Sequence, residues 1–282
     1  MFHAVTDRAW LWAAAGFYLA GFLLGAVALL RRRGPPGAAT YVLIAIGYAL
    51  QLAGLAARGR AVGGCPLGNQ FELYQFTAWS ATTLYLIVGV AFRHSLLGYF
   101  TSALAATLTL MSLAVPAWDA TSRTHIFGGN PWIELHAALA VFSYGVFGLL
   151  ALTSLMFLLR HHSLKAKELG GWFALLPSIR DLDHMSVRLL GAGAAILSAS
   201  LAVIAVIFVR EPSLVGVPKL LATAPVWLAY VAVAALRLRG RLIAQRFAWV
   251  CAGLFGAALL SLSLVDGERH APPAPHREAR AP

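Results

Sequence analysis

The sequence predicts an all-α fold, a polytopic membrane helix bundle with about eight transmembrane helices. Of the 282 residues, 60 % are hydrophobic and 12 % are charged, whereas soluble domains are about half apolar and about a quarter charged. The apolar residues form long continuous runs, rather than the alternating segments of about ten residues that are typical of a membrane β-barrel. A soluble domain, a disordered chain and a disulfide scaffold are therefore disfavoured.

Eight apolar runs define the expected spans, and each is near the roughly 20 residues that a helix needs to cross the hydrocarbon core. Backbone polar groups in lipid must be satisfied internally, so each run is expected to be a helix. The first run ends in three arginines with no small-residue cleavage site, and it is interpreted as a retained span rather than a signal peptide. The fifth is long enough to tilt or to project beyond the membrane. The expected spans are approximately 10–30, 39–57, 73–92, 96–115, 133–159, 187–209, 218–236 and 247–265.

The basic residues predict the orientation of the bundle, because cytoplasmic loops of membrane proteins are enriched in Lys and Arg. An outer N-terminus puts 13 of the 22 basic and three of the 11 acidic residues on the cytoplasmic side, a net charge of +10 there and +1 on the other side. Both termini are therefore expected outside. The overall charge of +11 is interpreted as an orientation signal, and nucleic acid is not an expected partner because no motif for it occurs. Residues 1–265 form the expected transmembrane domain, and residues 266–282 form a polar, proline-rich outer tail that is expected to be disordered.

Histidines at the ends of the spans are the first candidate functional residues. His136 stands at the start of the fifth span, and Ser143 and Tyr144 follow on the same helical face. Polar groups in a span tend to face the bundle interior or a cavity, and a neutral imidazole can ligate a haem iron. The alternative is that His136 anchors the span at the headgroup level. His270 lies beyond the last span on the same side, and is either a second histidine clamping a planar cofactor or a solvated tail residue.

Residues 65–79, with the sequence CPLGNQFELYQFTAW, combine a turn, a helix cap and aromatic side chains. Asn69 is a favourable N-cap, and Glu72 three residues later is placed to close a capping box and to meet the helix dipole. A well-made helix start explains this pattern by itself. The alternative is that Glu72, Phe76 and Trp79 face a cavity.

Other motifs that carry chemistry are missing from the sequence, which contains no nucleophile motif, Walker loop, Rossmann glycines or HExxH pair. The two cysteines match no metal-ligand spacing, and Cys65 is expected in a loop and Cys251 in the core. A small-molecule transporter would show interrupted spans and paired intramembrane charges, and neither is evident.

The order of these motifs resembles the cytochrome c assembly (CcsA/ResC-like) family of membrane proteins. Residues 66–79 are similar to its PLxNxYESLxFxxW segment, and residues 136–144 to its HxxxxxxSY motif. Residues 176–188 resemble its LPSLExLDxxxxR segment, and residues 227–249 its closing pair of spans. The resemblance covers about residues 40–270.

This resemblance implies a haem-handling protein of the bacterial inner membrane. Haem b would be bound at the outer face, with His136 and His270 as the metal ligands and with Glu72 and Trp79 as further cofactor-binding residues. The protein would present haem for attachment to apocytochrome c, and it would work with a partner membrane subunit. The reactivity would belong to the haem and to the thiols of the apocytochrome.

The sequence departs from the family between the sixth and seventh spans. The family carries WGxxWxWDPKE there, whereas residues 209–219 read VREPSLVGVPK, which keeps the Pro-Lys pair but neither the tryptophans nor the aspartate. This favours the HemX- and YpjD-like members, which share the fold and lack the loop. The alternative function is therefore a non-catalytic membrane scaffold or regulator, of haem synthesis or of another membrane complex.

Overall fold

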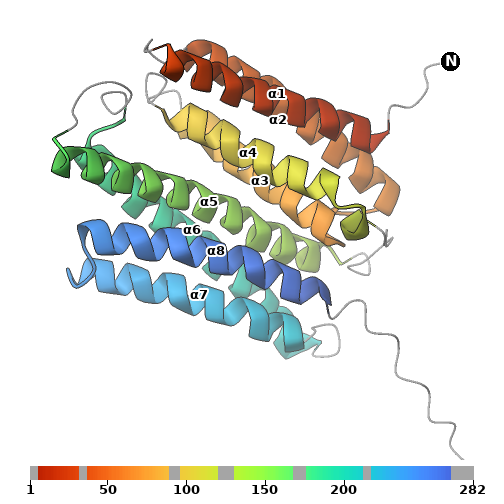
Figure 1. The fold of residues 1–282 in the computed structure, drawn as a ribbon. Coiled ribbons are helices and arrows are strands. Elements are labelled where there is room, and N and C mark those ends of the chain that lie inside the picture. The colour runs from red at the N-terminus through yellow and green to blue at the C-terminus, as the bar shows by residue number, and fades with distance from the viewer. Residues whose placement is uncertain are drawn as a thin grey trace, which may run out of the picture.

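The chain forms a bundle of long helices that lie alongside one another (Figure 1). The computed structural model describes residues 6–31, 37–88, 96–119, 130–167, 176–211 and 217–267, with the backbone alone for 88, 217–222 and 261–267. Within these ranges there are eight α-helices and no strand, which confirms the predicted all-α bundle and its number of helices. The helices are α1 (Asp7–Leu30), α2 (Gly37–Val62), α3 (Gln70–Val88), α4 (Leu97–Ala114), α5 (Pro131–Lys165), α6 (Ile179–Arg210), α7 (Val217–Leu238) and α8 (Ala244–Gly267), with a short 3₁₀ helix, η1 (Pro116–Asp119), after α4.

The lengths and apolar character of the helices make the chain a multi-pass membrane protein. Among the described residues, α1, α2, α4, α5 and α6 are long and apolar enough to cross a membrane, and α7 and α8 contain shorter apolar stretches. Helix α3 is more polar, because its sequence includes Gln70, Glu72 and Gln75, and all three of these side chains are buried.

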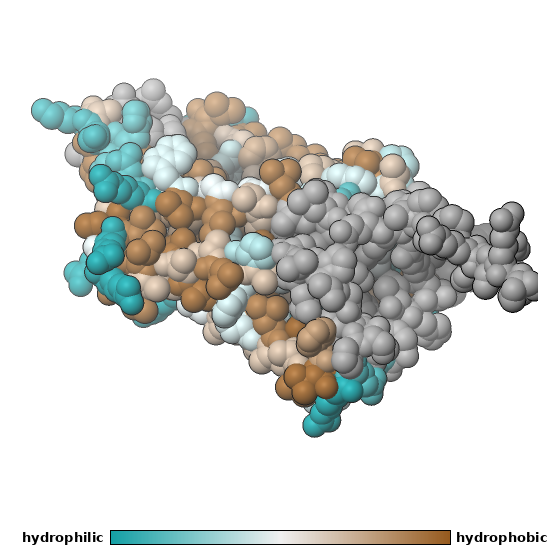
Figure 2. All heavy atoms as spheres, turned by 90° about the horizontal axis from the view of Figure 1, so that it is seen from below, coloured by the Kyte–Doolittle hydropathy of each residue, from teal (hydrophilic) through white to brown (hydrophobic). Residues whose placement is uncertain are grey.

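Successive helices run in opposite directions, so the loops collect at two ends of the bundle (Figure 1). The N-terminal end is defined here as the end where α1, α3, α5 and α7 begin, on the right of Figure 1; the opposite end contains the α7–α8 turn. Figure 2 shows hydrophilic residues at the left-hand, opposite end and apolar surface along the middle of the bundle. Which end faces outside stays a prediction from the charge distribution.

Helix α5 lies at the centre of the bundle, where it packs against α3, α6 and α8. Every residue from Ser143 to Ser154 on this helix is buried. A helix that is apolar on all sides is typical of such a buried position. Gly145 allows α3 to approach closely, because a Cβ atom at this position would overlap the Ser80 hydroxyl and would lie 2.7 Å from the Ala81 backbone nitrogen.

A network of buried amides and hydroxyls joins the first four helices. The Gln51 side-chain amide donates to Gln75 Oε1 at 2.8 Å, and the Tyr18 hydroxyl donates to Gln51 Oε1 at 2.9 Å. The Gln75 amide donates in turn to the Ser112 hydroxyl at 2.8 Å, which brings in α4. Hydrogen bonds of this kind hold helices together in lipid, where water does not compete for the polar groups.

Candidate functional site

The start of α3 is built as the sequence predicts. Asn69 caps the helix, because its Oδ1 accepts a hydrogen bond from the Glu72 backbone N–H at 2.9 Å. The Glu72 carboxylate is 1 % exposed. Its Oε2 accepts from the Gly68 backbone N–H at 2.5 Å, and its Oε1 accepts from Arg58 Nε at 2.6 Å. Both carboxylate oxygens thus have partners within the chain, as expected for a helix start; a contact of Glu72 with a cofactor stays a prediction.

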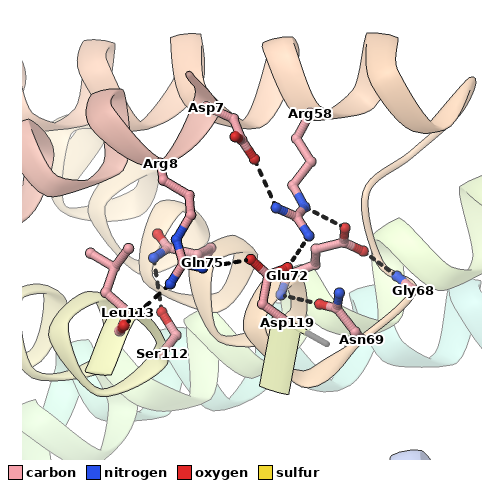
Figure 3. Close-up of polar contacts among 10 residues, drawn as sticks. All are labelled: Asp7, Arg8, Arg58, Gly68, Asn69, Glu72, Gln75, Ser112, Leu113 and Asp119. Carbon is pink, nitrogen blue, oxygen red and sulfur yellow. Dashed lines mark hydrogen bonds and ion pairs between the residues drawn. The ribbon is translucent and has the colours of Figure 1, made fainter. Parts of the chain in front are cut away.

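Arg58 connects four elements at the N-terminal end of the bundle (Figure 3). Its guanidinium pairs with Asp7 of α1 at 2.7 Å, with Glu72 of α3 and with Asp119 of η1. It also lies 4.8 Å from the centre of the Phe71 ring. The Arg58 side chain is only 8 % exposed. In the sequence, Arg58 stands out only as an arginine at the edge of an apolar run, with acidic residues at the ends of neighbouring runs, and no motif predicts its role.

Trp79 belongs to an aromatic cluster formed by α2, α3 and α5. Its ring stacks on Tyr48 with the ring centres 5.8 Å apart, and it also contacts Phe76 and the edge of Phe142. Its indole Nε1 is buried and has no hydrogen-bond partner within the described part of the chain. A buried donor without an acceptor is costly, so this N–H is available to an acceptor atom of a ligand or of an ordered water.

His136 pairs with Ser200 of α6, a residue that no motif in the sequence predicts. His136 Nδ1 lies 2.8 Å from both the backbone oxygen and the hydroxyl of Ser200. The Ser200 hydroxyl donates its one hydrogen to the His136 backbone oxygen at 2.8 Å, so it accepts from the ring. Both groups facing Nδ1 are therefore acceptors, and Nδ1 carries the proton. The neutral ring then keeps its lone pair on Nε2, the atom that can ligate a metal, and the described residues provide no donor to that lone pair.

A cavity of about 400 Å³ lies one helical turn from this pair, between the start of α5 and the end of α6. Apolar side chains form much of its wall. The cationic Arg210 and the anionic Glu211 also line it, near the end of the bundle. This lining suits a largely apolar molecule that carries a charged group. The residues that line it are Asn130, Trp132, Val203, Val206, Ile207, Arg210 and Glu211.

Some predicted features lie outside the described residues. These are His270, the polar tail from residue 268 onward, and residues 212–216 of the segment that differs from the family loop. Within the described ranges, no group of three or more His, Cys, Asp and Glu side chains gathers in a way that would hold a metal ion. The second axial ligand therefore stays a prediction.

Cys65 lies in the loop between α2 and α3, outside the membrane-spanning helices. Burial raises the pKa of its thiol to about 11, with further contributions from the nearby charges of Glu134 and Glu72. Because the thiolate is the reactive form, alkylation by iodoacetamide in a Cys251→Ala variant should accelerate about tenfold per pH unit between pH 8 and 10. The control is a cysteine introduced at the exposed Ser178 of a Cys65→Ala, Cys251→Ala variant, whose rate should level off above about pH 9. An alkylation rate of Cys65 that also levels off above about pH 9 would contradict the raised pKa of its thiol.

The chain resembles known proteins over most of its length. The family described as "Cytochrome C assembly protein" matches residues 67–264, a range that includes Glu72, Trp79, His136 and Ser200. The chain is 27 % identical to Protein HemX of Bacillus subtilis over 193 residues, which cover 66 % of this chain and 68 % of that protein. It is 29 % identical to Protein HemX of Brevibacillus brevis over 164 residues, which cover 57 % of this chain and 60 % of that protein. An uncharacterised 28.8 kDa protein of Azospirillum brasilense is 35 % identical over 97 residues, about a third of each chain.

Proposed function

The chain belongs to the cytochrome c assembly protein family, and on this premise we propose that it is a haem-handling membrane protein. It binds haem b at the N-terminal end of the bundle and presents it for attachment to apocytochrome c. The observation that carries the proposal is the His136–Ser200 pair, in which Ser200 keeps the proton on Nδ1 and leaves the Nε2 lone pair free. The donor set thus fits a haem iron, because a neutral imidazole is a common axial ligand.

Each residue of the site has a role in this proposal. His136 donates its Nε2 lone pair to the iron, and Ser200 orients the imidazole and maintains its tautomer. Arg210 stands at the neighbouring cavity, where a guanidinium pairs well with a propionate. His270 is the proposed second ligand, and the unpaired Trp79 N–H is a proposed polar contact to the cofactor. When bound, haem supplies the redox-active iron and the vinyl groups to which apocytochrome thiols add.

The charge distribution supports an outer position for the site. A net charge of +10 on the opposite side favours an N-terminal end that faces outward from a bacterial inner membrane. We propose that apocytochrome c receives haem on that side and that a partner membrane subunit holds it there. This chain would bind haem there and orient it through His136 and Ser200.

Loss of His136 should abolish haem binding. Wild-type protein purified from haem-replete cells should show b-type haem absorbance, and His136→Ala should lose it. Ser200→Ala should retain haem with an affinity lower by up to about 10-fold and with a shifted midpoint potential, because the imidazole loses the hydroxyl acceptor and keeps only the backbone oxygen of residue 200. The matched control is His184→Ala, an exposed histidine at the opposite end of the bundle, which should leave the absorbance unchanged.

Added imidazole should restore the absorbance of His136→Ala, because it fills the vacated position with the same ligand. Wild-type protein that is colourless and gives no spectral change with added haem would refute the proposal. An unchanged spectrum in His136→Ala would refute the assigned ligand.

The second candidate function is a non-catalytic scaffold or regulator, of haem synthesis or of another membrane complex. It is favoured by the similarity to two proteins named HemX and by the missing tryptophans in residues 209–219. The two functions differ in what haem-loaded protein does with a reduced Cys-x-x-Cys-His peptide. Haem presentation predicts covalent c-type haem on the peptide, whereas a scaffold predicts none and co-purifies with a haem-synthesis enzyme.

A further inference from the structure

A groove between α5 and α8 at the opposite end of the bundle combines an apolar floor with a basic rim. Its volume is about 410 Å³. The floor is formed by three leucines of α5, and the rim by nitrogen-bearing side chains of both helices. The lining residues are Leu155, Leu158, Leu159, His161, His162, Lys165, Gln245 and Trp249.

The rim of this groove suits an anion. None of the residues that line it is acidic, and Lys165 is exposed and positively charged. Helix α8 begins at Ala244, so the free backbone N–H groups and the positive dipole of its first turn lie beside Gln245. The preceding α7–α8 turn adds Arg239 and Arg241 close by in the sequence, which increases the positive potential.

The floor of the groove suits an acyl chain. Trp249 is 60 % exposed and Leu155 is 42 % exposed, so apolar surface remains uncovered beside the cationic rim. An amphiphile with an anionic head and a hydrocarbon tail matches both parts. We propose that this groove binds an anionic phospholipid, with its phosphate between Lys165 and the start of α8 and an acyl chain along Leu155 and Trp249.

Two other grooves at this end lack the combination of an apolar floor and a basic rim. One, of about 480 Å³ between α1, α4 and α5, is lined by no cationic residue. Another of similar volume includes Arg188, but Asp181 lies in the same lining and opposes an anionic headgroup. The predicted cytoplasmic position of this end agrees with the proposal, because basic pockets between helices on that side recognise anionic lipid headgroups. The proposal is independent of haem binding.

Native mass spectrometry of the full chain tests the proposed lipid site. Palmitoyl-oleoyl phosphatidylglycerol and phosphatidylcholine are supplied in equal amounts. Wild-type protein should retain phosphatidylglycerol preferentially. Lys165→Gln should weaken that retention about fivefold, as expected for loss of one cationic contact at a membrane surface. Trp249→Ala should also lower the retention of phosphatidylglycerol, because it removes the contact with the acyl chain. Arg180→Gln is the matched control, because it removes an equal charge from an exposed residue at the same end outside this groove.

Three results would overturn the proposal. The first is equal retention of the two lipids by wild-type protein. The second is an equal loss in Lys165→Gln and Arg180→Gln, which would mean a diffuse attraction to the whole basic surface. The third is full displacement of the lipid by glycerol 3-phosphate at the same concentration, which would mean that the acyl chain contributes nothing. Haem absorbance should be unchanged in the Lys165→Gln variant. A failure of the lipid proposal can therefore be distinguished from a failure of the proposed haem binding.

Discussion

Replacing Arg58 with alanine should destabilise the protein by about 3–5 kcal/mol, the cost typical of removing one partner from a buried ion pair. The guanidinium is 8 % exposed and pairs with three carboxylates. Without it, Glu72 at 1 % exposure stays buried and loses its cationic partner, and Asp119 at 9 % exposure keeps only its ion pair with Arg8. The start of α3 should then loosen, because the same Glu72 carboxylate also accepts from the Gly68 backbone.

The measurement is the midpoint of thermal unfolding in detergent, read as the loss of a monodisperse peak in size-exclusion chromatography. Arg8→Ala is the matched control, since its guanidinium is 38 % exposed and its one ion pair among the described residues is with Asp119. Because water reaches this guanidinium, the pair should contribute closer to about 1 kcal/mol. Arg58→Lys should fall between the two, because an ammonium keeps the charge but lacks the fork that reaches several carboxylates. Equal midpoints for Arg58→Ala and Arg8→Ala would contradict the central role of Arg58.

Replacing Gly145 with leucine should destabilise the protein by about 3 kcal/mol, at the upper end of the usual cost of overpacking. Its Cβ would overlap the Ser80 hydroxyl, which can rotate away, but would also lie 2.7 Å from the Ala81 backbone nitrogen. Helix α3 therefore has to move away from α5, and the buried contacts along this interface weaken together.

Gly253→Leu is the matched control. Gly253 lies in the middle of α8, and a Cβ atom there meets nothing within 4 Å. The two variants add the same side chain to a helical glycine, so the difference between their unfolding midpoints isolates the α3–α5 contact. A Gly145→Leu midpoint as high as that of Gly253→Leu would show that the interface can adapt.

The sequence located the helices well but not all of their ends. The sixth span was expected from residue 187, whereas α6 begins at Ile179, where the Ser178 hydroxyl accepts from the Asp181 backbone N–H at 3.1 Å. Helix α5 likewise continues to Lys165, beyond the expected end at residue 159. Hydropathy detects the part of a helix that is apolar enough to lie in the hydrocarbon core. The polar turns that extend the helix beyond that core have to be recognised from their capping residues.

The site was predictable where its contacts are local. Asn69 and Glu72 are three residues apart, so their capping contact follows from the sequence pattern. Arg58 and Asp119 are 61 residues apart, and His136 and Ser200 are 64 apart. Such pairings depend on the rotation and depth of whole helices against one another, and a single sequence does not specify these. His136 was singled out by its position and by resemblance, and only the structure identified the residue that orients it.

The order in which the partners of Arg58 are synthesised has a consequence for membrane insertion. Asp7 and Arg58 lie on the first two helices, ahead of residues 67–264, the range that matches the family. Their pairing at 2.7 Å therefore neutralises the arginine as soon as the α1–α2 hairpin is complete, before Glu72 and Asp119 have been made. The Asp7–Arg58 pair thus enters the bilayer without net charge of its own, and Glu72 and Asp119 join an ion pair that already exists.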